Sequence, residues 1–177
     1  MPKIKFIFIA AVSLDGKIGR NPNETSTVWT SQEDKKFLND ILNKIQVIVI
    51  GRKTYEIAIK PLSKRRCIVL TSQVEKIQQK SDLCYFFNPD AVNLKVFISE
   101  LGFSQAAVLG GTKTYDTLLS QGFIDEIYLT IEPIIFGAGL SLFSKKLSIL
   151  KNLKLDYVKK MNEDGSILLH YFLTNQP

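Results

Sequence analysis

The strongest constraint on the fold is a series of short, wholly apolar runs. Residues 47–50, 67–70 and 106–109 read Val-Ile-Val-Ile, Cys-Ile-Val-Leu and Ala-Ala-Val-Leu. Runs without alternating polar positions are typical of strands buried on both faces, as in a parallel sheet. The segment before the first of these runs carries apolar residues at helical spacing: Phe37, Leu38, Ile41, Leu42 and Ile45. This alternation predicts an α/β fold in which helices cover a mostly parallel central sheet.

The rest of the chain extends this pattern. Further candidate strands are residues 3–12, 83–87 and 126–131. Candidate helices are residues 90–101 and 112–120, each followed by a glycine. Residues 153–160 and 166–174 flank a turn-forming Asn-Glu-Asp-Gly, which predicts antiparallel C-terminal strands. The 177 residues fit a single domain, residues 1–177, with helices on both faces of the sheet.

Four of the strand ends carry polar or glycine-rich turns. These turns are residues 13–19, 51–54, 70–72 and 110–114. Ligands of such sheets bind at the carboxyl ends of the strands, so we expect the four turns to share one elongated site. Gly110-Gly111 would let the backbone lie against a ligand, and a helix start after it favours phosphate. A plain strand-to-helix turn explains the same two glycines.

Three side chains have both a binding and a structural interpretation. Arg52 follows a buried strand and its glycine, where a guanidinium either binds phosphate or is a surface charge. Asp34 lies three residues after the candidate helix cap Ser31, where the helix dipole alone favours an acid. A buried carboxylate there would instead hold the N–H–C–N edge of a heterocycle. Trp29 is either a core residue or one wall of a pocket for a planar ligand.

Charge and composition narrow the class of partner. The net charge of +6 includes scattered lysines, for which a solvated surface is the default interpretation, and it would also suit a small polyanion better than a nucleic acid. The apolar start of the chain is too short to span a membrane and has no cleavage pattern. Cys67 and Cys84 lie in apolar runs, as buried free thiols in a reducing compartment do, and no metal-ligand spacing occurs. The sequence therefore predicts a cytoplasmic protein without a metal, a membrane partner or a nucleic acid.

Several blocks of the sequence resemble the dihydrofolate reductase superfamily. The run Gly51-Arg52-Lys53-Thr54-Tyr55-Glu56, continuing to Thr71-Ser72, is similar to a run in those enzymes. The spacing from Trp29 to Asp34 matches theirs, and residues 108–115 resemble their diglycine segment. Residues 125–130 resemble their late strand. The resemblance implies a three-layer dihydrofolate-reductase-like fold over most of the chain.

Two further blocks, residues 11–18 and 132–143, resemble the reductase domain of the bifunctional riboflavin-biosynthesis deaminase-reductase. The chain lacks the zinc deaminase signature, so the resemblance implies a stand-alone reductase. Its implied reaction is NADPH-dependent reduction of 5-amino-6-(5-phosphoribosylamino)uracil. The alternatives are a dihydrofolate reductase that acts on dihydrofolate or another pteridine, and a non-catalytic nucleotide-binding protein. Val28, where dihydrofolate reductases have proline, and residues 57–64, which lack the Asp-x-Pro-x-Leu run of riboflavin reductases, leave the substrate open.

The resemblance also implies residue roles, with NADPH as the cofactor. Its nicotinamide would meet Ala11, Ile18 and Gly19. Its adenine-side phosphates would be held by Gly51, Arg52, Lys53, Thr54, Leu70, Thr71 and Ser72. Its pyrophosphate and nicotinamide side would lie along Leu109, Gly110, Gly111, Thr112, Lys113, Thr114 and Tyr115.

For the substrate, the resemblance implies Asp34 as the catalytic residue that grips the ring. Thr130 would be its hydrogen-bonding neighbour and Trp29 would line the pocket. Arg65 would pair with an anionic tail, and Asp15 would either contact the substrate or only form a turn. The same branch makes a homodimer an option, for which the apolar segment 134–143 is the candidate contact.

Overall fold

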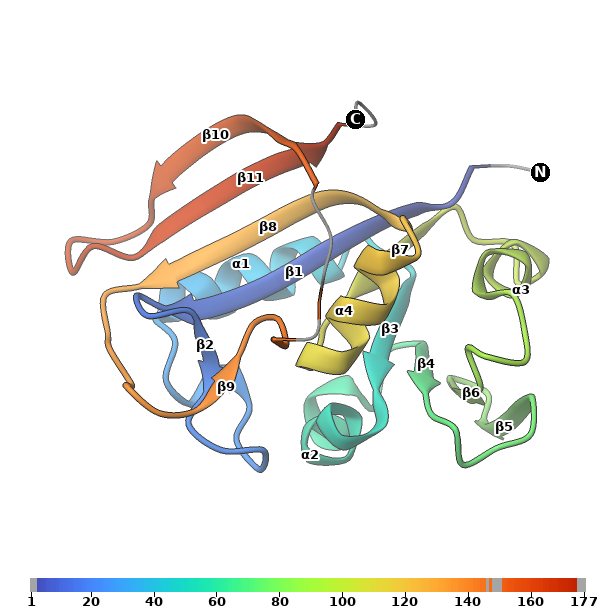
Figure 1. Cartoon of the computed structure of the whole chain (residues 1–177). Coiled ribbons are helices and arrows are strands. Elements are labelled where there is room, and N and C mark those ends of the chain that lie inside the picture. The colour runs from blue at the N-terminus through green and yellow to red at the C-terminus, as the bar shows by residue number, and fades with distance from the viewer. Residues whose placement is uncertain (1–2, 146, 148–150, 175–177) are drawn as a thin grey trace.

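A nine-stranded sheet with the order β10-β11-β8-β1-β7-β3-β4-β6-β5 forms the centre of the computed structural model, which describes residues 3–145, 147 and 151–174 (Figure 1). Its strands are β1 (Lys5–Ser13), β3 (Val47–Gly51), β4 (Cys67–Leu70), β5 (Ile77–Ser81), β6 (Cys84–Phe87), β7 (Gln105–Val108), β8 (Ile124–Glu132), β10 (Leu153–Lys160) and β11 (Ile167–Leu173). The six strands from β8 to β6 are parallel, while β5, β10 and β11 pair antiparallel at the two edges. This confirms the predicted α/β fold, a mostly parallel sheet with antiparallel C-terminal strands.

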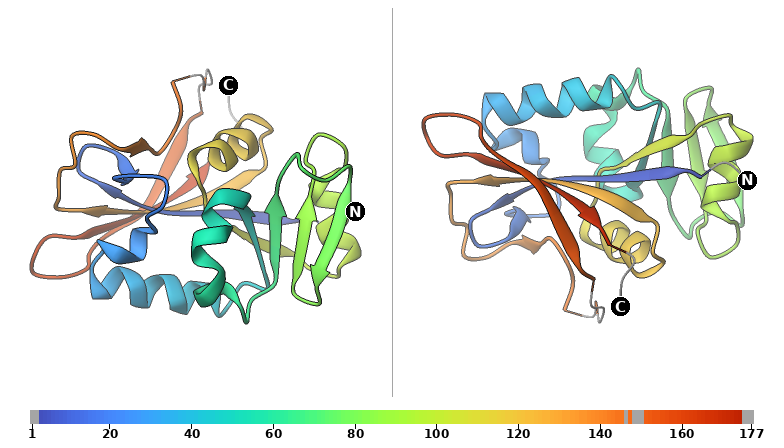
Figure 2. Two further views of the ribbon diagram at one scale, coloured as in Figure 1. Left: turned by 90° about the horizontal axis from the view of Figure 1, so that it is seen from below. Right: turned by 90° about the horizontal axis from the view of Figure 1, so that it is seen from above.

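Helices cover both faces of the sheet, as Figure 2 shows for α1 (Gln32–Leu42) and α2 (Arg52–Leu62) on one side and α4 (Thr112–Ser120) on the other. Leu42 and Leu62 pack with Ile48 and Ile50 of β3 on the first face. On the other face, α3 (Leu94–Glu100) and α4 pack against β1, whose Phe6 and Phe8 are fully buried. The apolar runs that alternate with helices in the sequence are therefore buried from both sides, as continuous apolar strands require.

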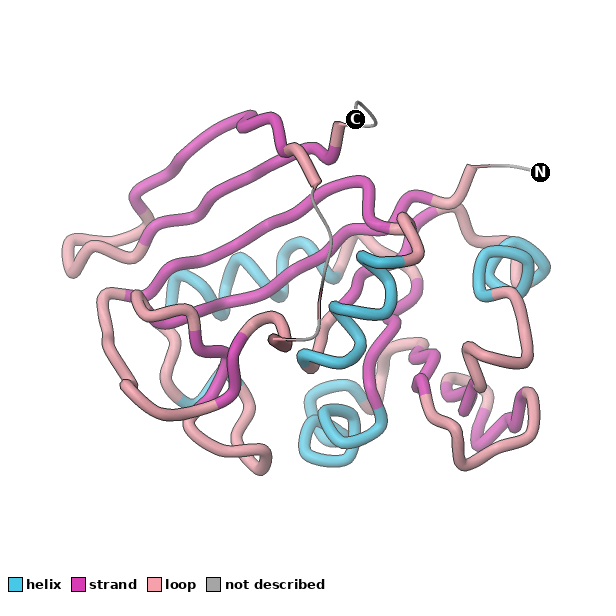
Figure 3. Tube along the Cα trace, viewed as in Figure 1, coloured by secondary structure: helices cyan, strands magenta, loops and turns pink. Residues whose placement is uncertain are grey.

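Several elements differ from the sequence prediction, as the element types along the chain in Figure 3 make clear. The predicted helix 90–101 shortens to α3, because Asn93 caps it by accepting a hydrogen bond from the Val96 N–H at 3.2 Å. The helix α2 was not among the candidate helices of the sequence, and it holds Pro61 in its last turn. The sequence also gave no signal for β5, which is exposed at every position, or for the short strands β2 (Lys17–Gly19) and β9 (Leu140–Ser141) that pair with each other.

The parallel strands β1, β7, β3 and β4 are neighbours in the sheet, so their carboxyl ends lie at one rim. That rim carries the four turns singled out above. A 3-10 turn, η1 (Ser26–Val28), lies in the long segment between β2 and α1. Because the two crossovers through α1 and α4 lie on opposite faces, the rim is flanked by helices from both sides.

Candidate active site

A cleft of about 390 Å³ lies at this rim, lined by residues of β1, β3, α1, α2, the segment after β7 and the segment after β2. Its lining includes nine of the residues predicted to bind cofactor or substrate: Ala11, Ile18, Asp34, Thr54, Arg65, Leu109, Gly110, Gly111 and Tyr115. These residues come from segments far apart in the sequence. The structure thus brings the diglycine and the candidate acid into one cavity.

The first wall of the cleft, here called the glycine wall, consists of Gly110 and Gly111 backed by Gly51. The Gly51 N–H donates to the Gly110 carbonyl at 2.8 Å, and a cis peptide bond joins the diglycine. Gly110 has a φ of +86°, and a β-carbon there would lie 3.0 Å from the Tyr115 hydroxyl. At Gly111 a β-carbon would lie 3.2 Å from Thr54 Oγ1. A side chain at either position would press on Tyr115 or Thr54, and without one the backbone of this wall is open to a ligand lying close against it.

Tyr115 fixes the glycine wall to the sheet. Its hydroxyl donates to the Ile9 carbonyl at 2.7 Å, and its ring stacks on Phe8 with centroids 4.0 Å apart. Burial raises the pKa of the phenol well above its ordinary range, so Tyr115 stays a neutral donor. The start of α4 is therefore held at a fixed place beside β1.

Asp34 lies on the opposing helix α1 and is 5% exposed. Its N–H is capped by Ser31 Oγ at 3.2 Å, which fixes the first turn of the helix. Loss of hydration raises the pKa of its carboxyl, the nearby hydroxyls of Thr130 and Thr30 oppose this rise, and the negative charge of Glu132 adds to it. The cleft thus contains a buried carboxyl that holds a proton more tightly than ordinary aspartate does.

Glu132, at the end of β8, entered the sequence analysis only as the first residue of the block 132–143. In the structure its side chain holds the start of α1 in place. Its carboxylate accepts from both the N–H and the hydroxyl of Ser31, each at 2.8 Å, and also from the Ser166 hydroxyl. The buried pair of acids, Asp34 and Glu132, lies where β8 meets α1. No pattern in the sequence connects positions 101 residues apart, so this contact could not be predicted.

The sequence pattern of the family described as dihydrofolate reductase matches residues 5–135. The chain belongs to the dihydrofolate reductase family. Within that range lie β1, both walls of the cleft and the first three residues after β8. The family is one of oxidoreductases, and the fold described above is that of such a reductase.

Three solved structures share the fold. A pyrimidine reductase-like protein from Corynebacterium diphtheriae is 17% identical, with a TM-score of 0.76 over 98% of this chain and 93% of that one. The Thermotoga maritima diaminohydroxyphosphoribosylaminopyrimidine deaminase/5-amino-6-(5-phosphoribosylamino)uracil reductase is 16% identical, with a TM-score of 0.71 over 97% of this chain and 57% of that one. The dihydrofolate reductase of Enterococcus faecalis, complexed with NADP(H) and RAB-propyl, is 21% identical, with a TM-score of 0.65 over 97% of both chains.

The second wall of the cleft is here called the side-chain wall. Besides Asp34 it consists of an apolar surface made of Leu38, Leu42, Ile57, Ala58, Pro61 and Leu62. None of these apolar residues was predicted from the sequence to line a site. Leu38 and Leu42 follow Asp34 at intervals of four residues, so helical spacing was the signal that would have placed them on its face. Lys35 and Arg65 also line the cleft, where they add positive charge.

Arg65 is held in place by two contacts within the chain. Its guanidinium donates to the Leu42 carbonyl at 2.7 Å and to Asn43 Oδ1 at 2.9 Å. Both acceptors lie at the end of α1, so the arginine joins α2 and α1 across the outer part of the side-chain wall. Arg65 lines the cleft, and its role as an anion-binding residue stays a prediction.

Three predicted substrate residues lie outside the lining of this cleft. Asp15 accepts hydrogen bonds from the Ser13 hydroxyl at 2.7 Å and from the N–H groups of Phe136 and Gly137 at 3.1 and 2.9 Å. These bonds lower the pKa of its carboxyl, and they fasten one loop to another. Trp29 lines a separate pocket of about 230 Å³ beside Glu132, and Thr130 is fully buried behind Asp34. Asp15 was expected either to contact the substrate or only to form a turn. In the structure it forms the turn and the contact between the two loops.

The remaining predicted cofactor residues surround the cleft without lining it. Arg52 pairs with Glu56 at 2.5 Å one turn along α2, and the Thr112 hydroxyl donates to the Ser141 carbonyl at 2.5 Å. The Thr71 hydroxyl accepts from the Gln73 N–H at 3.2 Å. The other predicted cofactor residues outside the lining differ in exposure. Gly19, Leu70 and Thr114 are buried, whereas Lys53, Ser72 and Lys113 are exposed.

Within the described residues, no group of three or more His, Cys, Asp or Glu side chains could hold a metal ion. In the same part of the chain, none of the helices is long and apolar enough to cross a membrane. Cys67 and Cys84 are buried free thiols on neighbouring strands, as expected from the sequence.

Proposed function

We propose that this protein is an NADPH-dependent reductase of a small nitrogen heterocycle. The observation that carries the proposal is the pairing of a buried, proton-retaining carboxyl, Asp34, with a bare glycine wall in one cleft. A backbone wall accepts a long, flat ligand at close range, and a buried carboxyl recognises a ring edge with two hydrogen-bonding positions.

The residues present fit a dinucleotide cofactor. Gly110 and Gly111 line the cleft with bare backbone, and the start of α4 presents N–H groups next to it. Thr54, Arg52, Lys53, Thr71 and Ser72 would hold its phosphates, while Ala11, Ile18 and Gly19 would meet the nicotinamide. NADPH, when bound, would supply a hydride to an electrophilic carbon of the substrate.

The chain itself would orient the ring, exclude water and manage one proton. Asp34 would hold the N–H–C–N edge of the substrate, with Thr130 fixing the carboxyl from behind. Because burial raises its pKa, the same carboxyl would pass a proton, directly or through water, toward the nitrogen beside the carbon that receives the hydride. Ile9, Ala10 and Leu109 make the floor apolar, which strengthens each polar contact made there.

Our first candidate substrate is 5-amino-6-(5-phosphoribosylamino)uracil. The blocks 11–18 and 132–143 and the likeness to the Corynebacterium and Thermotoga reductases support it. Lys35 and Arg65 would provide positive charge for its phosphate. The reaction with this substrate would be hydride transfer to the sugar-derived carbon next to nitrogen.

A second candidate, dihydrofolate or another pteridine, is favoured by the side-chain wall. The surface between Asp34 and Arg65 is made of Leu38, Leu42, Ile57, Ala58 and Pro61, which suits an apolar, aromatic arm better than a hydroxyl-rich one. Arg65 would then pair with a carboxylate at the end of that arm. The two candidates share the glycine wall and Asp34 and differ only at this surface.

The deciding experiment is steady-state NADPH oxidation with each substrate, run beside calorimetric titration of NADPH. We expect NADPH to bind and one of the two substrates to be reduced, and Asp34→Asn to lose turnover but keep NADPH binding. NADPH binding without turnover of either substrate would support the non-catalytic nucleotide-binding alternative. Absence of NADPH binding would refute the proposal.

A further inference from the structure

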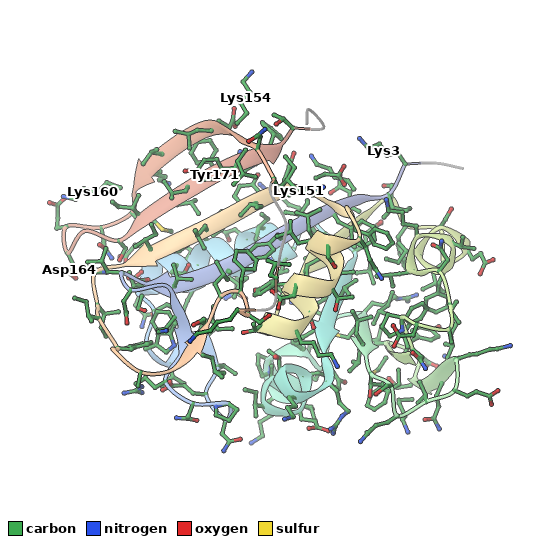
Figure 4. All side chains as sticks on the ribbon, viewed as in Figure 1. Lys3, Lys151, Lys154, Lys160, Asp164 and Tyr171 are labelled. Carbon is green, nitrogen blue, oxygen red and sulfur yellow. The ribbon has the colours of Figure 1, made fainter. Side chains whose placement is uncertain are left out.

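The turn between β10 and β11, residues 161–166, is built around one asparagine side chain. Figure 4 labels Asp164 in this turn. Asn162 Oδ1 accepts hydrogen bonds from the N–H groups of Gly165 and Ser166, each at 3.0 Å. Asn162 Nδ2 donates to the Ser166 hydroxyl oxygen, also at 3.0 Å. The backbone and the side chain of Ser166 are therefore both held in place by the turn.

Ser166 connects this turn to Glu132 of β8 and, through Glu132, to α1. Ser166 is 1% exposed, and its hydroxyl donates to Glu132 Oε2. The other carboxylate oxygen, Oε1, accepts from the N–H and from the hydroxyl of Ser31. Ser31 Oγ in turn accepts from the Asp34 N–H. A chain of hydrogen bonds thus runs from the hairpin turn to the residue that carries the buried acid of the cleft.

The connecting side chains lie outside the cleft. Ser31, Glu132 and Ser166 line the separate pocket beside Trp29, whereas Asp34 lines the cleft itself. A ligand in the cleft would therefore meet Asp34 and not the residues behind it. Any effect of Glu132 on such a ligand must pass through Asp34.

Glu132 is a buried acid whose polar contacts are all with neutral groups. It is 4% exposed, and none of the ion pairs among the described residues involves it. Taking a carboxylate out of water is costly even when neutral donors surround it, and an uncharged side chain would avoid that cost. Departures of this kind from the most stable choice are expected at functional sites. The charge of Glu132 therefore calls for a role besides holding a helix start.

We propose that Glu132 is a positioning residue of the reductase, which directs the Asp34 carboxyl toward the ring edge of the substrate. This inference rests on the proposed function and deepens it. Glu132 acts first through Ser31, which fixes the turn of α1 on which Asp34 lies. It acts also through its charge: burial is the largest cause of the raised pKa of Asp34, and the negative charge of Glu132 adds to it.

The other titratable groups around Asp34 stay in place when Glu132 is changed. Glu33, its neighbour on α1, is exposed and accepts from Asn162 Nδ2 at 3.2 Å. Those that line the cleft or the pocket beside Glu132 are Glu24, Lys35, Arg65, Tyr115 and Asp164. A changed titration of Asp34 in a Glu132 variant can therefore be assigned to Glu132.

Two substitutions separate the charge of Glu132 from its contacts. In Glu132→Gln the amide oxygen can accept both hydrogen bonds from Ser31, as Oε1 does, and the amide N–H can donate to the Ser166 oxygen. This variant removes the charge and keeps the start of α1. Glu132→Ala removes the charge and the contacts together.

Carbon-13 NMR of the aspartate carboxyls measures the effect of the charge in protein without ligands, with Asp34→Asn to assign the signal. We expect Asp34 to lose its proton at lower pH in Glu132→Gln than in the wild type, because removal of a nearby negative charge favours the ionised carboxyl. Glu126→Gln is the matched control. Glu126 is also buried and lies on the same strand, but it takes no part in these contacts, so the titration of Asp34 should not change.

Steady-state kinetics measure the effect of position. Glu132→Ala should lower kcat by roughly 10- to 100-fold, because a displaced carboxyl no longer meets the ring edge. Its NADPH dissociation constant should stay within about twofold of the wild-type value. Glu132→Gln should recover most of the loss at low pH, and its activity should decline at a lower pH than that of the wild type. A residue that only stabilised the fold would not move this decline.

Two results would overturn the proposal. One is an Asp34 titration that is the same in Glu132→Gln and the wild type, or that Glu126→Gln shifts equally. The other is a wild-type kcat in Glu132→Ala, with circular dichroism showing that the variant is folded. Failure of the proposed function is distinguishable from both, because it appears as a wild type that turns over neither substrate, whereas the NMR comparison requires no turnover.

Discussion

The two walls of the cleft are built in opposite ways. The glycine wall functions through missing side chains, because a β-carbon at Gly110 or Gly111 would meet Tyr115 or Thr54. The side-chain wall functions through what its side chains are, namely a buried acid, an aliphatic surface and an arginine. A wall of bare backbone fits any ligand of the right shape, so it suits a cofactor shared by many enzymes. A wall of side chains distinguishes one ring and one arm from another.

The largest test of this contrast is Asp34→Asn. The change keeps the shape of the side-chain wall but removes the carboxyl that retains a proton and that we propose orients the ring. We expect turnover to fall by roughly 10²- to 10³-fold while the NADPH dissociation constant stays within about twofold. Steady-state kinetics and calorimetry on the same preparation measure both.

Ser31→Ala provides the matched control for that variant. It removes the cap on the Asp34 N–H and one hydrogen bond to Glu132 but leaves the carboxyl in place. It should lower the free energy of unfolding by about 1 kcal/mol and change turnover much less than Asp34→Asn does. Equal losses of turnover in the two variants would mean that Asp34 serves only the helix start.

The glycine wall is tested by Gly110→Ala. The added methyl group meets Tyr115 in a backbone conformation that side chains rarely adopt, so the wall must move. We expect NADPH binding to weaken by roughly 10- to 100-fold and the free energy of unfolding to fall by about 1–3 kcal/mol. Calorimetry and chemical denaturation measure the two effects.

Gly102→Ala separates backbone conformation from wall geometry. Gly102 has a φ of +80°, close to that of Gly110, but a β-carbon there would have nothing within 4 Å. This variant should lose about 1 kcal/mol of stability and bind NADPH normally. If it weakens NADPH binding as much as Gly110→Ala, the effect arises from general destabilisation and the glycine wall has no special role.

The same contrast explains how far the sequence could be interpreted. Parallel strands were evident from apolar runs such as residues 47–50, and the glycine wall from Gly110-Gly111, because both signals are local. Asp34 was found by its spacing from Trp29, although Trp29 itself lies in another pocket. Glu132 and Arg65 owe their places to contacts with Ser31 and Leu42 across the fold. Such long-range contacts leave no periodic trace, so the substrate-selecting wall was the harder half to predict.

A change at Leu38 should reveal which arm the side-chain wall accepts. Leu38→Ser removes part of the aliphatic surface one turn after Asp34 and leaves the acid and the glycine wall unchanged. For a pteridine with an aromatic arm, KM should rise by about 5- to 20-fold with little change in kcat. For the phosphoribosylamino-uracil, KM should stay within about twofold, because a hydroxyl-rich arm gains little from leucine. Ile59→Ser serves as the control, because it makes a similar replacement of an aliphatic side chain by serine outside the cleft lining.

The smallest expected effect is a dependence of protein stability on pH that arises from the Asp34 carboxyl in the side-chain wall. Burial raises the pKa of Asp34, so the folded state binds this proton more tightly than the unfolded state. The resulting stabilisation is complete below the ordinary aspartate pKa of 3.8 and is lost as pH rises through the raised pKa of the folded state. Since asparagine does not titrate, the Tm of Asp34→Asn relative to wild type should increase across that window and then level off.

Asp15→Asn should give the opposite sign, because hydrogen bonds from Ser13 and Phe136 lower the pKa of Asp15, and the wild type then loses its advantage as pH falls. Equal slopes for the two variants would show that the titration reflects net charge and not the environment of the cleft.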